Sequence, residues 1–301
     1  PEPGPGLLTT ALKLKPMSHL KSWRQRLEQT LLGHVPPTWL TERQVTRLRA
    51  VPDDLWQRTL ASYPFLAWRS LTDLQRLRDL CALFLARKQF TPAGGLDLTD
   101  EMAVGIAAQA CLPALHHGLG VYERFVGVVV HPGLIVAPRT EYDELTGVVH
   151  HYQEVLAGET MPGGPITLSW QDVAQAQQMS DFAGQPYNVV IHEFAHALDM
   201  ADGDANGMPR LPAHLSDRHW EDTLWQAFDQ LSEALAHGES IWLDPYAVED
   251  GLVEFFPVIT EAFFVAPKKL QAEHPEVYRL LSEYFKDDPA SWEGRQAPAA
   301  A

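Results

Sequence analysis

The sequence predicts an α+β fold that is predominantly helical and contains a small mixed sheet. Apolar residues recur at helical spacing over most of the chain. Continuous or alternating β-branched runs, which are typical of strands, occur between about residues 125 and 170. A long apolar helix is also expected where the chain carries a His-Glu-x-x-His motif, from His192 to His196. The fold is therefore expected to be helical layers around a few strands.

Charge is distributed unevenly along the chain of 301 residues, which has a net charge of -16. Residues 1–90 contain 14 Lys and Arg against 7 Asp and Glu, and the remainder contains 9 against 32. The acidic main body argues against nucleic acid as a direct partner, because phosphates would be repelled. We interpret the basic part as a helical layer packed on the acidic body, with a nucleic-acid-binding arm as the alternative.

Cysteine usage and hydropathy indicate the compartment. Cys81 and Cys111 are the two cysteines, which is too few for a disulfide framework or a cysteine zinc site. No apolar run approaches the roughly 20 residues that span a bilayer. Residues 7–14 are too short and too interrupted for the apolar part of a secretion signal. We therefore expect a cytoplasmic protein that does not bind a membrane.

The N-terminal part of the chain is predicted to be a helical region over residues 16–92, after a disordered tail over 1–15. Thr41, with Gln44 three residues later, forms a capping-box pattern that starts a short helix. The break at residues 91–95, which contains Pro and two Gly, places a boundary near residue 92. The helices expected in this region cover residues 19–32, 41–50, 53–63 and 70–87.

The second region is predicted to cover residues 93–292, followed by a disordered tail over 293–301. Its strands are expected at 125–130, 133–137 and 164–170. Because the last of these alternates and begins with Gly164-Pro165, an edge strand is favoured. Its helices are expected at 99–115, 171–178, 221–238, 252–265 and 276–285, and residues 199–212 are expected to form a loop.

The motif helix carries the candidate metal ligands. His192 and His196 are one helical turn apart, so they project from the same face and together could hold Zn²⁺. Glu193 lies beside them, where a carboxylate could take a proton from a water. Asp199 is three residues past His196 and could hold a histidine ring in the correct tautomer. The alternative is a helix surface with two solvated histidines, but the apolar neighbours favour a metal because unpartnered buried polar groups are costly.

A third protein ligand is required, and two placements outside the later helices receive little support. The metzincin pattern needs Gly at position 199 and His or Asp at 202. Asp202 fits this pattern, but Asp199 stands where the glycine is required. A distant histidine is another option. The three candidates of that kind lie in polar surroundings, and they are His214, His219 and His237.

A glutamate on a later helix is the favoured third ligand. Glu254 is followed by Phe255 and Phe256, so its carboxylate is expected to be poorly solvated and in need of a partner. Glu261 follows two helical turns later on the same face. It is the second candidate, either as a ligand or as a group that supports one.

Several separated motifs occur together in a fixed order. They are Asn-Val-Val-Ile-His-Glu-Phe-Ala-His-Ala-Leu-Asp at 188–199, Asp-Pro-Tyr-Ala at 244–247, Glu-Phe-Phe at 254–256 and Glu-Ala-Phe-Phe at 261–264. Cys-Leu-Pro at 111–113 and Gly-Pro-Ile-Thr-Leu-Ser-Trp at 164–170 accompany them. From about residue 75 to 290 the chain thereby resembles the Mlc titration factor A family of bacterial zinc peptidases, whose active site is similar to that of the anthrax lethal factor catalytic domain.

The resemblance implies a zincin-like catalytic domain over residues 93–292 and a gluzincin-like site with one Zn²⁺ per chain. The implied ligands are His192, His196 and Glu254, with Glu193 as the general base. Tyr246 is implied to face the oxyanion that develops during hydrolysis. One departure is that Tyr246 precedes Glu254 by eight residues, where the family pattern has seven.

We therefore expect a zinc-dependent metallopeptidase that hydrolyses a peptide substrate with a zinc-activated water, and the resemblance implies aminopeptidase-like activity. The peptide is expected to lie along the strand at 166–170, although that strand could equally be an ordinary sheet edge. The resemblance also suggests binding to a glucose-responsive, Mlc-like transcriptional repressor. The main alternative is a regulatory protein that sequesters such a repressor, with catalysis secondary or the zinc structural. A purely structural zinc site would need four protein ligands.

Overall fold

The computed structural model describes residue 23 and residues 40–142, 149–175 and 185–294, and the side chains of 137–142 and 149–154 are not considered. It confirms a predominantly helical α+β fold with a small mixed sheet and a zincin-like core. The N-terminal tail, the helix expected at 19–32 apart from Trp23, the end of the helix expected at 171–178 and residues 295–301 of the C-terminal tail lie outside the described residues.

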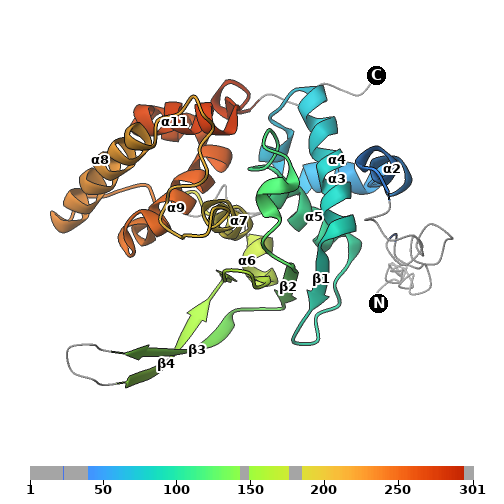
Figure 1. Ribbon diagram of the computed structural model, residues 1–301, viewed down its shortest axis with the longest axis horizontal. Coiled ribbons are helices and arrows are strands. Elements are labelled where there is room, and N and C mark those ends of the chain that lie inside the picture. The colour runs from blue at the N-terminus through green and yellow to red at the C-terminus, as the bar shows by residue number, and fades with distance from the viewer. Residues whose placement is uncertain (1–22, 24–39, 143–148, 176–184, 295–301) are drawn as a thin grey trace, which may run out of the picture.

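The N-terminal helices form one side of the molecule (Figure 1). They are α2 (Glu42–Leu48), α3 (Asp53–Ser62) and α4 (Leu71–Arg87), with a 3₁₀ turn, η2 (Pro64–Ala67), between the last two. The predicted capping box is present, because Gln44 N donates to the Thr41 hydroxyl and Thr41 N donates to Gln44 Oε1. Ser70 caps α4 in the same manner by accepting from Asp73 N.

Helix α5 (Asp100–Cys111) is the central helix between the N-terminal layer and the motif helix, α7 (Val189–Asp199). It is buried along almost its whole length and packs on α3, α4 and α7. Cys111 at its end and Cys81 on α4 are both buried and free. Gly105 allows the close approach of α3, because a Cβ there would lie 2.9 Å from the Tyr63 ring. Buried apolar residues from Val45 to Ala290 belong to one cluster, and the predicted boundary near residue 92 stays a prediction.

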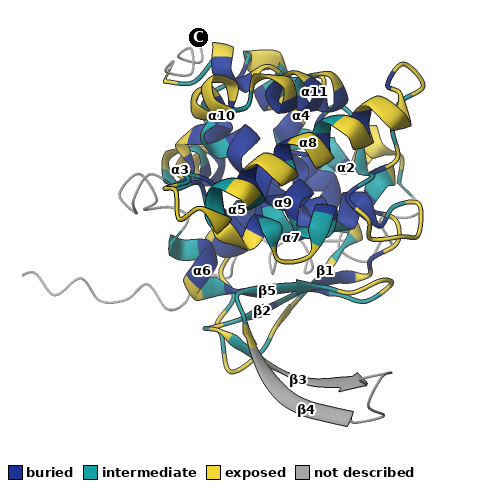
Figure 2. Ribbon diagram, turned by 90° about the vertical axis from the view of Figure 1, so that its left-hand side faces the viewer, coloured by how far each residue is buried: buried dark blue, intermediate teal, exposed yellow. Residues whose placement is uncertain are grey.

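A four-stranded sheet lies beneath the helices (Figure 2). Its order is β1 (Gln89–Pro92), β2 (Gly127–His131), β6 (Ile166–Ser169) and β5 (Gly158–Thr160). The first three are parallel, and β5 pairs antiparallel with β6. The prediction that 164–170 is an edge strand was wrong, because β6 is internal and β5 is the edge. Pro165 causes no conflict since it precedes the first paired residue, Ile166.

A two-stranded hairpin projects from the body (Figure 1). It consists of β3 (Ile135–Tyr142) and β4 (Val149–Leu156), paired antiparallel. Only the beginning of β3 was predicted. The chain passes directly from β4 through Ala157 into β5, so the hairpin emerges beside the edge of the main sheet.

The remaining helices surround the motif helix α7, which packs against α9 (Gly251–Val265). These helices are α6 (Trp170–Gln175), α8 (Asp217–Ala236), α10 (Pro267–Glu273) and α11 (Pro275–Phe285). Three short 3₁₀ turns accompany them, which are η3 (Leu119–Tyr122), η4 (Pro245–Val248) and η5 (Pro289–Ser291). Helix α8 begins four residues before its predicted start, since Ser216 caps it by accepting from His219 N. Helix α10 was not predicted, and prolines in their first turns start both α10 and α11.

Within the described parts of the chain, none of the helices combines the length and the apolar character needed to cross a bilayer.

Candidate metal centre

The position of the motif histidines is fixed by the other face of helix α7, which is buried. Asn188 caps the helix, with its side-chain oxygen accepting from Ile191 N at 2.9 Å. Phe194 is fully buried and packs edge-on against Phe84, Tyr122 and Phe125. This packing fixes the rotation of α7 about its axis, so that the histidines one turn apart point toward α9.

Three donor atoms from α7 and α9 converge. His192 Nε2 lies 3.1 Å from Glu254 Oε2 and 3.2 Å from His196 Nε2, and His196 Nε2 lies 3.4 Å from Glu254 Oε2. Ligands about 2.0 Å from a tetrahedral ion are about 3.3 Å apart, so the observed triangle matches such a site. Among the described residues, this is the one group of three His, Cys, Asp or Glu side chains close enough to hold a metal ion.

The chemistry of the three donors also fits a cation. Two imidazole nitrogens that face each other at 3.2 Å cannot both carry a proton without repulsion, and a shared cation removes the conflict. Burial alone would raise the pKa of Glu254, but the close contacts with the imidazoles of His192 and His196 outweigh burial and hold the pKa well below its ordinary value. Glu254 is therefore ionised and suited to a metal.

Glu261 supports the site from behind. Its Oε1 lies 2.8 Å from His192 Nδ1, which assigns the proton to Nδ1 and leaves the Nε2 lone pair for the metal. The other carboxylate oxygen accepts from Asn188 N, and the Asn188 side chain donates to Gln109 Oε1 at 2.8 Å. Glu261 was expected from the sequence, whereas Asn188 and Gln109 had no predicted role. No pattern in the sequence identifies Gln109, because it lies 79 residues before Asn188.

Strand β5 contacts the proposed general base directly. The Thr160 hydroxyl donates to Glu193 Oε2 at 2.6 Å. A Cβ at position 158 would lie 2.4 Å from Glu193 Oε1, so only glycine leaves room for the carboxylate. Burial raises the pKa of Glu193, while the neighbouring His192 and His196 and the Thr160 hydrogen bond oppose the rise. Gly158 and Thr160 were not predicted from the sequence, because a three-residue strand has no readable alternation.

Tyr246 borders the same site despite its changed spacing. Its ring centroid lies 5.9 Å from that of His192. Burial raises the pKa of Tyr246 well above its ordinary value, and the negative charge of Glu254 and a hydrogen bond to Glu254 raise it further. The hydroxyl therefore keeps its proton. Tyr246 lies in the 3₁₀ turn η4, which Asp244 caps by accepting from Tyr246 N at 3.0 Å.

A cavity of about 570 Å³ opens beside these groups. It is bordered by the start of β5 at Gly158, by His192 and Glu193 on α7, and by Tyr246. Glu249 adds a carboxylate to its wall. A space of this size next to a candidate metal site is large enough for part of a peptide.

Asp199 lies apart from the converging donors. Its Oδ2 accepts from Asn206 N at 2.9 Å and from Gly207 N at 2.8 Å, while its Oδ1 is buried without a hydrogen-bond partner. Burial raises the pKa of Asp199 to about 6. Asp199 thus organises the loop after α7, and its predicted support of a histidine ring stays a prediction.

Comparison with known proteins identifies the family. A model of the family described as glucose-regulated metallo-peptidase M90 matches residues 37–286. Mlc titration factor A of Pectobacterium atrosepticum is 37% identical over 238 residues, which cover 78% of this chain and 86% of that protein. An uncharacterized protein of Synechocystis is 34% identical, covering 84% and 91% of the two chains, and Mlc titration factor A of Yersinia pestis is 33% identical, covering 80% and 89%. The matched residues 37–286 make up most of the chain and include both α7 and α9, which carry His192, His196 and Glu254. The chain therefore belongs to the glucose-regulated metallo-peptidase M90 family.

Proposed function

We propose that this chain is a zinc-dependent peptidase with aminopeptidase-like activity. The observation that carries the proposal is the triangle of His192, His196 and Glu254 donors, 3.1–3.4 Å apart, beside the buried Glu193 carboxylate. Two imidazoles and one carboxylate are a donor set that suits Zn²⁺ and leaves a fourth position for substrate or water. A structural zinc site would require a fourth protein ligand, and the group found among the described residues has three.

The proposed roles follow from the surroundings of each side chain. When bound, Zn²⁺ supplies a Lewis acid that lowers the pKa of a water and polarises a carbonyl. Glu193, held by Thr160, takes a proton from the attacking water and returns it to the leaving amine. Tyr246, which keeps its proton, donates a hydrogen bond to the oxyanion of the tetrahedral intermediate.

The peptide is proposed to add to the free edge of β5, in place of the strand favoured by the sequence. Strand β5 is the outer strand of the main sheet and contacts α7. Its residues Gly158 and Thr160 both contact Glu193, so a peptide hydrogen-bonded along β5 passes the general base. The resemblance to zinc peptidases supports the aminopeptidase-like choice.

Glu193→Gln tests the peptidase proposal because the variant keeps the shape but loses the base. Bound zinc is measured by mass spectrometry, and hydrolysis of alanine p-nitroanilide and short peptides is measured with the zinc-loaded protein. The expected result is full zinc occupancy with a loss of about 10²–10⁴-fold in kcat. Glu221→Gln, an exposed glutamate on α8, is the control and keeps wild-type rates. Equal hydrolysis by Glu193→Gln and wild type would overturn the proposal.

A second function is supported by the names of the relatives. Two similar proteins are called Mlc titration factor A, and we propose that this chain also binds an Mlc-like, glucose-responsive repressor. Calorimetry with such a repressor tests binding directly. Undiminished binding by Glu193→Gln would separate repressor binding from catalysis, whereas the absence of binding to wild type would remove the second function and leave the peptidase proposal intact.

A further inference from the structure

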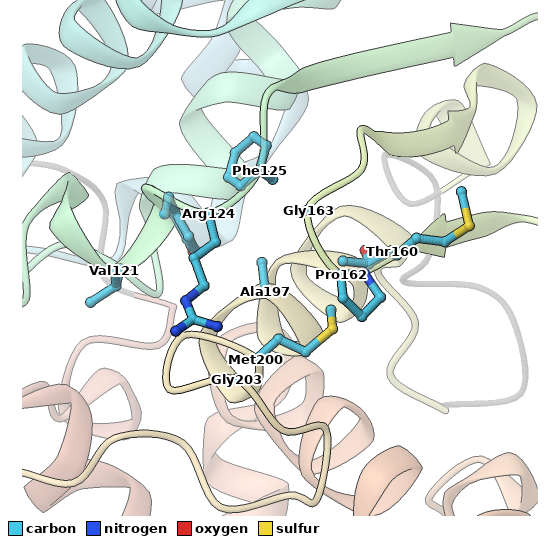
Figure 3. A pocket seen from close by; sticks show the side chains of 11 residues that line it. Val121, Arg124, Phe125, Thr160, Pro162, Gly163, Ala197, Met200 and Gly203 are labelled. Carbon is cyan, nitrogen blue, oxygen red and sulfur yellow. The ribbon is translucent and has the colours of Figure 1, made fainter.

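A second, smaller cavity of about 40 Å³ lies at Thr160, between the end of β5 and the segments around Arg124 and Met200 (Figure 3). Thr160, whose hydroxyl donates to Glu193 Oε2, forms part of its wall. Apolar side chains from three segments make up most of the rest, which are Val121 and Phe125, Met161 and Pro162, and Ala197 and Met200. The smaller cavity therefore lies at the Thr160 end of β5, and the Thr160 hydroxyl connects its wall to Glu193, which borders the 570 Å³ cavity.

Strand β5 relates the two cavities to a bound peptide. Gly158 borders the larger cavity and Thr160 borders the smaller one. Two residues of strand extend about 6.6 Å, so an extended peptide alongside β5 passes both within two residues. A peptide added antiparallel, the commoner pairing, runs with its N-terminal end toward Thr160. The residue on the amino side of the cleaved bond then faces the smaller cavity.

Arg124 supplies a cation at the rim of the smaller cavity (Figure 3). Its Nη2 donates to the main-chain oxygen of Asp202 at 3.2 Å. Gly203 leaves space for the guanidinium, because a Cβ there would lie 3.2 Å from Nη1. Within the described part of the chain, Arg124 has no carboxylate partner in an ion pair. Four of its five N–H donors therefore remain available to a ligand.

Arg124 is a cation in the strongly acidic part of the chain. Residues 91–301 hold 9 Lys and Arg against 32 Asp and Glu, yet Arg124 has no acidic partner among the residues described. An arginine fork binds a carboxylate with paired, charge-assisted hydrogen bonds. The apolar walls suit the methylene groups of a short side chain whose carboxylate reaches the rim.

We propose that Arg124 and the cavity around it form the subsite for an acidic residue, Asp or Glu, on the amino side of the cleaved peptide bond. This inference rests on the proposed peptidase function and specifies its substrate class. The competing interpretation is a solvated surface arginine with no ligand. That interpretation predicts no dependence of substrate choice on residue 124.

The kinetic test compares glutamate, alanine and lysine p-nitroanilides as substrates of the zinc-loaded protein. Wild type is expected to cleave the glutamate compound best. In Arg124→Ala the ratio of kcat/KM for glutamate over alanine is expected to fall by about tenfold or more, because a charge-assisted hydrogen bond is lost. In Arg124→Glu the preference is expected to move to lysine. Arg210→Ala, an exposed arginine that borders neither cavity, is the control and keeps the wild-type ratio. An unchanged ratio in both Arg124 variants would overturn the proposal.

A binding test separates this proposal from the peptidase function. Glu193→Gln is titrated by calorimetry with Glu-Ala-Ala and with Ala-Ala-Ala, with and without Arg124→Ala. Tighter binding of Glu-Ala-Ala that is lost with Arg124→Ala supports the subsite even if wild type hydrolyses neither peptide, in which case only the peptidase function fails. Equal binding of both peptides, together with measurable hydrolysis by wild type, would overturn the subsite and leave the peptidase function standing.

Discussion

Glu261 Oε1 lies 2.8 Å from His192 Nδ1, so a carboxylate on α9 orients the imidazole ring of the first motif histidine on α7. The same carboxylate accepts from Asn188 N at the start of α7. The Glu261 side chain thus has two roles. It accepts a hydrogen bond from the backbone of the residue that caps the motif helix, and it sets the tautomer of the first motif histidine. Glu254, two helical turns earlier on α9, has its carboxylate on the opposite, Nε2 side of that ring, 3.1 Å away.

This division of roles predicts different effects for the two glutamates. Glu254→Ala removes a ligand and is expected to abolish stoichiometric zinc binding. Glu261→Ala is expected to weaken zinc affinity by about 10–100-fold, since the ring loses its orienting partner. Competition with a chromogenic chelator measures both, and Glu249→Ala, an exposed acid nearby, serves as the control. Retention of zinc by Glu254→Ala with loss in Glu261→Ala would reverse the assignment.

A methyl group at position 158 is predicted to displace the general base without removing the metal. The Cβ of Gly158→Ala would lie 2.4 Å from Glu193 Oε1, so the carboxylate must move. Zinc content is expected to stay unchanged while kcat falls by about 10²-fold, as for a misplaced catalytic group. Steady-state kinetics of the zinc-loaded variant measures this. Gly120→Ala, which has open space around it, no left-handed backbone and a place outside both cavities, is the comparison for the general effect of an added methyl group. A kcat within threefold of wild type in Gly158→Ala would contradict the prediction.

How far the sequence predicts this site depends on the element concerned. Helices α7 and α9 are long and apolar, so helical spacing alone pairs His192 with His196 and Glu254 with Glu261. Local spacing cannot show which glutamate reaches the metal, because both lie on one face of α9. That distinction depends on how α9 packs against α7, which is a tertiary contact.

Strand β5 illustrates what the sequence could not predict. It has three residues, and its role arises from pairing with Ile166–Ser169 and from contact with Glu193. The run at 164–170 has the local features of an edge strand, because it begins with Gly-Pro and alternates. The edge position instead depends on whether another segment pairs beside it, and Gly158–Thr160 carries no local signal for that pairing.

The Thr160 hydroxyl is predicted to hold Glu193 in position. Thr160→Val keeps the shape but removes the 2.6 Å hydrogen bond, so kcat is expected to fall by about tenfold with KM little changed. Thr160→Ser restores a hydroxyl and is expected to recover most of the lost rate. Kinetics on the zinc-loaded proteins, with zinc content measured in parallel, distinguishes this effect from metal loss. Equal rates for the Val and Ser variants would show that the hydroxyl has no such role.

Asp199 is predicted to make stability depend on pH. Burial raises its pKa from the ordinary 3.8 to about 6, so the folded chain binds more protons than the unfolded chain between these values. The contribution of Asp199 to stability is therefore greatest below about pH 4 and is lost as the pH rises through about 6. Asp199→Asn keeps an oxygen to accept from Asn206 N and Gly207 N but cannot ionise.

The asparagine variant is expected to be more stable than wild type at pH 7, by about 3 kcal/mol for a shift of this size. Its free energy of unfolding should also vary less between pH 4 and 6. Urea unfolding of the two proteins at a series of pH values measures both effects. Asp229→Asn, an exposed aspartate on α8, provides the control and should follow wild type. A variant less stable than wild type at pH 7 would contradict the sign of this prediction.

Tyr246 is predicted to act on the transition state and not on substrate binding. Its hydroxyl is protonated and borders the cavity beside His192 and Glu254. Because an oxyanion donor is used only as charge develops, Tyr246→Phe is expected to lower kcat by about 10²-fold while KM changes little. Tyr187→Phe is the matched control, because Tyr187 borders the same cavity but its hydroxyl donates to Asp172 Oδ1 at 3.4 Å. An equal loss in both variants, or a rise in KM alone for Tyr246→Phe, would show that Tyr246 lines the site without stabilising the oxyanion.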